Sequence, residues 1–239
     1  DLTSAVQKGR PTYQHLLELY EQLFEQFPRA QLTLKCTTFI AAIDLQRFAN
    51  IHHLDITPCG DIIDVSVLSG VHKLDLHLSS CEEVINISTL GRVHSLCLSG
   101  CNKEMNLSAL GNVHQLHLMY FSQLSDVSAF ENVHTLSFYA CKNLTDISAL
   151  GHVYTLGLAN CHNIMDVSML GRVHTLSISD CDRIRDISAL GSVHDLYVSA
   201  SHPGNGVALI TNVSTLGTVH TLHLQGCCCV TDVSMLGTV

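Results

Sequence analysis

A segment of about 20 residues recurs along most of this chain, and it restricts the possible folds more than any other feature of the sequence. A representative unit, residues 173–192, reads VHTLSISDCDRIRDISALGS. The general pattern is V-H-x-L-x-L-x-x-C-x-x-I-x-D-I-S-x-L-G-x. A fixed period in this range is typical of solenoids, in which each unit buries its apolar side only against its neighbours. Nine units begin at Ile51, Val71, Val93, Val113, Val133, Val153, Val173, Val193 and Val219.

The first part of each unit, V-H-x-L-x-L, alternates with period two and predicts a short strand with both leucines on one face. One strand per unit, always in the same direction, predicts a parallel sheet. About 14 residues remain for the return path, too few for a helix and two loops. We therefore expect extended chain and 3-10 turns there, in a right-handed crossover. The side chains expected to face the core of the representative unit are Val173, Leu176, Ile178, Cys181, Ile184, Ile187 and Leu190.

The repeat resembles the leucine-rich repeat pattern L-x-x-L-x-L-x-x-N/C-x-L from residue 31 to the end of the chain. It is most similar to the cysteine-containing subclass, and its Asp-Ile-Ser-x-Leu segment resembles the convex half of internalin-like repeats. The V-H-T-L units also resemble repeat proteins of amoeba-infecting giant DNA viruses. The resemblance implies an α/β repeat solenoid with a concave sheet that binds proteins. The repeat cysteines are Cys59, Cys81, Cys101, Cys141, Cys161, Cys181 and Cys227.

Three regions follow from the pattern. Residues 1–29 are expected to hold a flexible start and an amphipathic helix that caps the solenoid, although a partner-binding helix is the alternative. Residues 30–50 form a degenerate first repeat, and residues 51–239 hold the nine repeats, the last open at its C-terminal end. The eighth unit has six additional residues centred on 201–206, which should protrude as a loop.

Composition excludes several classes of partner. The formal net charge of −9 argues against nucleic acid, which requires a basic surface. Apolar residues are periodic and never form a run long enough to span a membrane. Seven of the eleven cysteines occupy one repeat position, where a buried thiol acts as a small hydrophobe. This favours an intracellular, reducing compartment, such as the cytoplasm of a host cell.

Two rows of polar residues run through the repeat. Adjacent strands lie about 4.8 Å apart, so the histidines at the second position can stack. A metal array is the alternative, but zinc needs converging ligands and a linear row does not converge. We therefore expect a structural ladder without metal or cofactor. Its members are His52, His72, His94, His114, His134, His174, His194 and His220, with Tyr154 in the remaining unit.

The second row consists of aspartates such as Asp146, Asp166 and Asp186, and it contains asparagine at Asn86, Asn106 and Asn212. Acid–base catalysis needs carboxylates, whereas Asp and Asn share the ability to cap a turn. We interpret Asp-Ile-Ser-x-Leu-Gly as a capped 3-10 turn, with the glycine at a left-handed end.

A partner-binding surface is expected on the outward strand residues of the concave face. Tyrosine is enriched at interface hot spots, and the aromatic residues and histidines gather in two groups. We predict a non-enzymatic protein-interaction scaffold that uses this face and the eighth-repeat loop. A structural or self-assembling solenoid, associating through its open C-terminal end, is the alternative, followed by a metal-binding or catalytic protein. The predicted contact residues are His117, Tyr120, Tyr139, Asp195, Tyr197 and His223.

Overall fold

The computed structural model describes residues 13–26, 33–36, 46, 49, 51–56, 64–78, 84–100, 105–202 and 206–237. Within these residues ten strands form one parallel sheet, in which the spatial order of the strands is the sequence order. The strands are β1 (Thr33–Cys36), β2 (His53–Ile56), β3 (Lys73–His77), β4 (Ser95–Ser99), β5 (Gln115–Met119), β6 (Thr135–Tyr139), β7 (Thr155–Ala159), β8 (Thr175–Ser179), β9 (Asp195–Ser199) and β10 (Thr221–Gln225).

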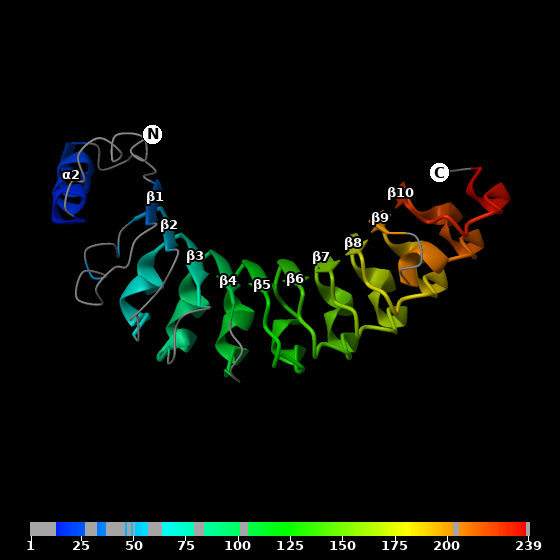
Figure 1. Ribbon diagram of the computed structural model, residues 1–239, viewed down its shortest axis with the longest axis horizontal. Coiled ribbons are helices and arrows are strands. Elements are labelled where there is room, and N and C mark those ends of the chain that lie inside the picture. Colours follow the sequence, from blue (N-terminus) through cyan, green and yellow to red (C-terminus); the bar gives the residue numbers. More distant parts are fainter. Residues whose placement is uncertain are drawn as a thin grey trace.

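The return path of each unit contains a short 3-10 helix, as the sequence predicts. The molecule is an arc, with the strands along its inner side and the 3-10 helices along its outer side (Figure 1). These helices are η2 (Ser66–Gly70), η3 (Ile87–Arg92), η4 (Ser108–Asn112), η5 (Ser128–Phe130), η6 (Ser148–His152), η7 (Ser168–Arg172), η8 (Ser188–Ser192), η9 (Gly206–Leu209), η10 (Ser214–Thr218) and η11 (Ser234–Leu236).

The core is continuous from one unit to the next. The two strand leucines of a unit pair in register with those of its neighbours, as Leu136 does with Leu156 and Leu156 with Leu176. Because side chains alternate along a strand, both leucines of a unit point inward. The seven inward positions predicted for the representative unit all have exposed fractions of 1% or less. Burial in this one-dimensional core stabilises each unit through its neighbours.

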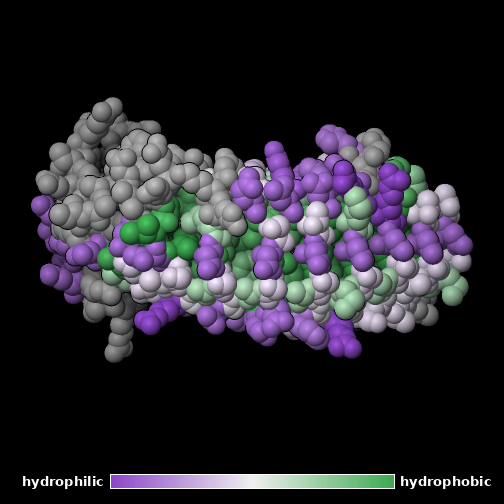
Figure 2. Space-filling model, turned by 90° about the horizontal axis from the view of Figure 1, so that it is seen from below, coloured by the Kyte–Doolittle hydropathy of each residue, from purple (hydrophilic) through white to green (hydrophobic). Residues whose placement is uncertain are grey.

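The turns of the convex side are capped by the aspartate row. The Oδ1 atom of Asp146 accepts a hydrogen bond of 2.9 Å from the backbone N–H of Ser148. Asp166 and Asp186 make the same bond, and Asn106 and Asn212 make it with their amide oxygens. Asn86 departs from this pattern, because it has a left-handed backbone conformation (φ 62°). Figure 2 shows the convex face, where hydrophilic groups recur at regular intervals along the long axis.

The expected role of the repeat glycine was wrong. Gly151 and Gly171 lie inside 3-10 helices rather than at a left-handed end, and the glycines with positive φ among the described residues are Gly100 and Gly226. A Cβ atom at Gly151 would collide with the carbonyl oxygen of Met169 in the next unit, and one at Gly171 with that of Ala189. Glycine is needed here because the convex backbones of adjacent units approach closely.

Helix α2 (Tyr13–Gln26) occupies the predicted position. Leu19 and Leu23 are half-buried, whereas Gln22 is exposed. Figure 1 places α2 beyond β1, at the N-terminal end of the arc. Its role as a cap stays a prediction, and its expected N-cap and the proline after it lie outside the described residues. No helix in the described chain is long and apolar enough to cross a membrane.

The ends of the repeat region differ from its middle. Strand β1 of the degenerate first repeat pairs in parallel with β2, from Thr33 opposite His53 to Cys36 opposite Ile56. In the eighth unit Ser201 and His202 are exposed, and residues 203–205 of the predicted loop lie outside the described residues. Val207 then occupies the position of the repeat cysteine and is fully buried.

Candidate functional site

The eight ladder histidines and Tyr154 form one stack along the rim where the strands begin. Successive ring centroids from His52 to His220 are 4.4–4.7 Å apart. The spacing follows from the distance between strands. A buried valine or isoleucine precedes each histidine, and the inward strand leucine follows two residues later, so the ring between them is directed to the rim, where His72, His94 and His114 are exposed.

At His94 the stack makes proton binding less favourable. Partial burial, followed by the proximity of His72 and His114, lowers the pKa of His94 from its ordinary value. A row of rings presents its nitrogens side by side and does not surround an ion. Among the described residues, one place brings three possible metal ligands together, where Asp195 lies beside His174 and His194.

The predicted contact residues of the fourth and fifth units lie together. The rings of Tyr120 and Tyr139 meet edge to face with centroids 5.2 Å apart, and we call them the tyrosine pair. Tyr139 ends β6, and Tyr120 directly follows β5 with a φ of 61°. His117 lies on the concave face, half-buried, and its Nδ1 is 2.6 Å from the hydroxyl oxygen of Ser137. Burial lowers the pKa of His117, which favours the neutral ring.

The remaining three contact residues belong to β9 and β10. The rings of Tyr197 and His223, which are paired in register, have centroids 6.3 Å apart. Asp195 begins β9 on the same side of the sheet as Tyr197, two residues away. Its carboxylate, however, is directed to the histidine stack, with Oδ1 3.0 Å from Nδ1 of His194. Asp195 therefore belongs to the rim as much as to the concave face.

Small side chains separate the two aromatic groups. The mid-strand positions of β6, β7 and β8 are Ser137, Gly157 and Ser177, which are paired in register. With strands about 4.8 Å apart, β6 and β9 are about 14 Å apart. The concave face thus has an aromatic group on each side of a smooth, shallow segment.

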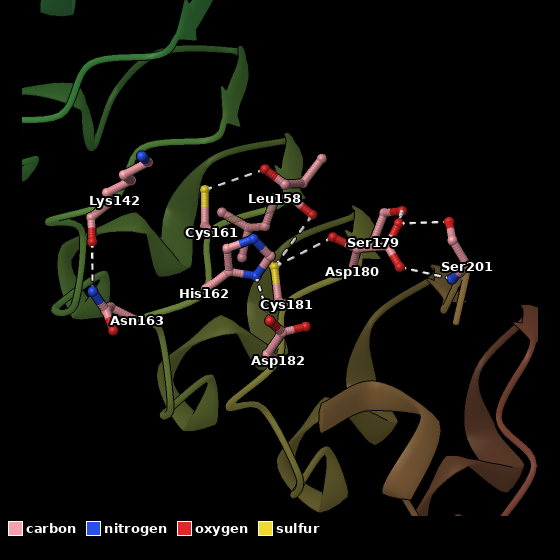
Figure 3. A network of polar contacts seen from close by, with 11 residues as sticks. Lys142, Leu158, Cys161, His162, Asn163, Ser179, Asp180, Cys181, Asp182 and Ser201 are labelled. Atoms are coloured by element: carbon pink, nitrogen blue, oxygen red, sulfur yellow. Dashed lines mark hydrogen bonds and ion pairs between the residues drawn. The ribbon is translucent and has the colours of Figure 1, made fainter. Parts of the chain in front are cut away.

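Sequence reasoning missed the polar network on the rim where the strands end. Figure 3 shows that contacts between successive units link these residues. Nδ1 of His162 is 2.8 Å from the carboxylate of Asp182. Asp180 accepts hydrogen bonds from the backbone N–H and the hydroxyl of Ser201, both at 2.7 Å, and so attaches the start of the eighth-repeat loop. The two residues of each contact lie about one repeat apart in the sequence, and this spacing could have indicated that they meet.

Ion pairs on the first strands were also missed. Nζ of Lys35 is 2.9 Å from Asp55, and Nε2 of His53 is 2.7 Å from Asp75, on the concave side of β1–β3. The thiol of Cys97 lies half-buried beside them. Burial, with some effect of Asp75 and Asp55, raises the pKa of this thiol to about 11. Such a thiol is a poor nucleophile near neutral pH.

The repeat cysteines within the described residues serve the core. Cys141, Cys161 and Cys181 are fully buried, and the thiol of Cys181 donates to the carbonyl oxygen of Leu158 in the preceding unit at 3.7 Å. Burial raises the pKa of Cys181 to about 12. Cys228, next to the repeat cysteine Cys227, is exposed. Cys59, Cys81 and Cys101 lie outside the described residues.

One parallel strand per repeat on the inside of an arc, with a 3-10 return path outside, defines a leucine-rich repeat solenoid. No protein-family model and no curated protein sequence matches the chain. The class therefore rests on the sheet, the register and the repeat.

Several solved structures are similar to this chain in fold, with low sequence identity. The functional domain of InlJ from Listeria monocytogenes, which includes a cysteine ladder, has a TM-score of 0.49 and 16% identity, over 83% of this chain and 49% of that chain. Internalin C2 from Listeria monocytogenes has a TM-score of 0.45 and 16% identity, over 83% and 80%. The plant peptide hormone receptor RGFR1 in complex with RGF2 has a TM-score of 0.35 and 12% identity, over 82% and 46%. This chain thus spans about half the length of the first.

Proposed function

We propose that this chain is a non-enzymatic protein-interaction scaffold, which holds a protein partner on its concave face between the tyrosine pair and the eighth-repeat loop. The observation that carries the proposal is the tyrosine pair itself. Two aromatic rings are packed against each other and still exposed, with exposed fractions of 52% for Tyr120 and 38% for Tyr139. Tyrosine offers a large apolar surface and a polar end, and it loses little conformational entropy on binding.

The shape of the concave face supports an extended segment of the partner as the bound element. Ser137, Gly157 and Ser177 leave room above β6–β8 for a polypeptide backbone, and the aromatic groups at either side offer contacts for larger side chains. Tyr197 and His223 would contact one end of the segment and the tyrosine pair the other. Aromatic residues at the centre of an interface typically supply most of its binding free energy.

A peptide-display selection on the intact chain tests this function. Peptides that bind the wild type should bind a Tyr120→Ala/Tyr139→Ala variant at least about 30-fold more weakly, since each hot spot is worth about 2 kcal/mol. The matched control is Met165→Ala/Met169→Ala, which removes two exposed apolar side chains elsewhere and should leave the affinity unchanged. Unchanged affinity in the tyrosine variant would refute the concave site.

Self-assembly is a second candidate, favoured by the last coil described. Leu222, Leu224 and Leu236 are half-exposed, whereas their counterparts Leu196, Val198 and Leu216 in the eighth repeat are fully buried. Val233 has an exposed fraction of 58%. Association through this face would bury these side chains. Light scattering over a concentration series should show oligomers of the wild type that Val233→Lys dissociates, and a concentration-independent monomer would exclude this candidate.

The proposed compartment is intracellular and reducing, such as the cytoplasm of a host cell. Seven cysteines among the described residues are free thiols: Cys97, Cys141, Cys161, Cys181, Cys227, Cys228 and Cys229. We expect protein that is taken without reductant from the cells that produce it, and then denatured, to titrate with a thiol reagent as eleven free thiols. A count lower by an even number would indicate disulfides and an oxidising compartment.

A further inference from the structure

We propose that His174, His194 and Asp195 bind one divalent transition-metal ion of the zinc type at the rim of the solenoid. The two histidines are neighbours in the stack, and Asp195 begins the strand that follows His194. Each of the three side chains offers one possible ligand atom, and these atoms lie within 4.8 Å of one another.

The distances suit a small ion after a slight contraction. Nδ1 of His194 is 3.0 Å from Oδ1 of Asp195, and Nδ1 of His174 is 3.9 Å from Oδ2. Bonds of about 2.0–2.1 Å around tetrahedral zinc place its ligand atoms about 3.3 Å apart. The first separation is shorter and the second longer than this value, and they end at different oxygens of Asp195, so one oxygen must approach both nitrogens when the ion binds. An ion would replace the hydrogen bond between His194 and Asp195 and draw His174 inward.

The parallel arrangement of the rings explains why the proposed metal site occurs at one position along the stack. Ring nitrogens in a stack lie side by side, so two histidines alone do not surround an ion. A third ligand must lie at the edge of the stack, between two rings. Only the eighth repeat supplies a carboxylate there. The residues that follow the rim position in the other strands are His53, Lys73, Ser95, Gln115, Thr135, Thr155, Thr175 and Thr221.

Neighbouring groups hold the carboxylate in place. The hydroxyl of Thr175 donates to Oδ2 of Asp195 at 3.3 Å. The side chain of Thr221 also makes a hydrogen bond to this carboxylate. Tyr154 stacks on His174 and His220 on His194, with centroid separations of 4.4 and 4.5 Å. Support of this kind orients the ligands of metal sites.

The site remains accessible from solvent. The exposed fractions of the side chains are 37% for His174, 48% for His194 and 22% for Asp195. Three protein ligands leave the fourth tetrahedral position for water or for a donor atom of a partner. Two imidazole nitrogens and one carboxylate oxygen favour zinc, cobalt, nickel or copper over calcium and magnesium, which prefer oxygen ligands.

The test uses the intact chain, Zn²⁺ alone, and a readout that distinguishes individual histidines. Each histidine is carbethoxylated at neutral pH with increasing Zn²⁺, and the modified sites are quantified by peptide mass spectrometry. His174 and His194 should be protected together, with one apparent dissociation constant, while His72 and His94 in the same stack remain reactive. Readout at single histidines separates this site from metal bound by the exposed thiol of Cys228.

The variant Asp195→Asn retains the shape of the side chain and removes its charge. We expect its apparent dissociation constant for Zn²⁺ at His174 and His194 to rise at least about tenfold, with a melting temperature near that of the wild type in the absence of zinc. Asp182→Asn, which removes a carboxylate beside His162 on the other rim, should change nothing at His174 and His194.

Three results would overturn the proposal. One is equal protection of all the stacked histidines, which would indicate unspecific binding to imidazoles. Another is unchanged protection in Asp195→Asn. The last is the absence of protection at Zn²⁺ concentrations up to about 1 mM, where the free energy of binding is only about −4 kcal/mol.

Discussion

At the scale of single residues, the position directly after strands β5 to β8 is under backbone strain. Tyr120, Ala140, Asn160 and Asp180 occupy it with φ between 49° and 61°. The left-handed turn directs the chain out of the sheet, and the N–H of the turning residue still donates to the next unit, as Ala140 does to Ala159 at 2.9 Å. Asn and Asp tolerate this conformation, whereas alanine has no side-chain hydrogen bond to offset its cost.

Replacing Ala140 by glycine should therefore stabilise the protein. Relief of the left-handed strain exceeds the added entropy of the unfolded chain, so the free energy of unfolding should rise by roughly 0.5–1 kcal/mol. Denaturant titration followed by circular dichroism measures it. Ala149→Gly, inside η6, is the matched control and should lower stability. A loss of stability in Ala140→Gly would contradict this explanation.

At the scale of elements, the 3-10 helices determine how closely the coils approach each other on the convex side. Gly151 in η6 lets the carbonyl oxygen of Met169 in η7 approach the backbone so closely that a Cβ atom at residue 151 would collide with it. Where Glu131 replaces this glycine, η5 is shortened to Ser128–Phe130.

Gly151→Ala should lower the free energy of unfolding by about 1–3 kcal/mol, because the new methyl group meets backbone that cannot move without shifting a whole coil. The matched control is Gly157→Ala on β7. There a Cβ would lie 3.2 Å from the Cβ of Ser137, a side chain on the open concave face. Urea titration of both variants compares them, and equal losses would show that close approach on the convex side is not the cause.

Helix α2 gives a prediction at the same scale. If it caps the solenoid, Leu23→Ser should lower the melting temperature by several degrees, because this half-buried side chain then covers the apolar end of the first repeat. Gln22→Ser, at the exposed neighbouring position, should have no effect. Equal melting temperatures of Leu23→Ser and the wild type would favour the alternative of a free, partner-binding helix.

At the scale of the whole molecule, the histidine stack couples stability to pH. Partial burial and the neighbouring histidines lower the pKa of His94 in the folded state below the unfolded value of 6.5. The folded protein then binds fewer protons than the unfolded chain, so the stabilisation is complete above about pH 6.5 and is lost as the pH falls through the folded pKa. The pKa values of the turn aspartates are lowered by serine N–H groups, as at Asp146. The stabilisation that these aspartates contribute is therefore lost below about pH 4.

We therefore expect the melting temperature to decrease between pH 8 and about pH 5, and again below about pH 4. Thermal melts at a series of pH values measure this, and His94→Gln should reduce the first decrease while His202→Gln, outside the stack, should not. A melting temperature unchanged between pH 8 and about pH 5 would show that the stack does not affect stability.

Most of the fold could be predicted because its signals are local or repeat at one period. Alternation placed the strands, and the number of residues between them left room for 3-10 turns alone. The interchange of Asp and Asn indicated a cap, because the hydrogen bond from Ser148 to Asp146 spans only two residues. All three signals can be read without knowing how distant parts of the chain pack.

The sequence by itself thus determined the repeat, the parallel sheet, the inward side chains and the position of the histidine row. Only the tertiary structure decided what residues of neighbouring coils do to each other. It showed that Gly151 serves close approach, that Tyr120 and Tyr139 meet edge to face, and that Asp195 turns toward His174 and His194. The physical reason is that these contacts depend on the pitch and curvature of the stacked coils, which arise from the packing of all units together.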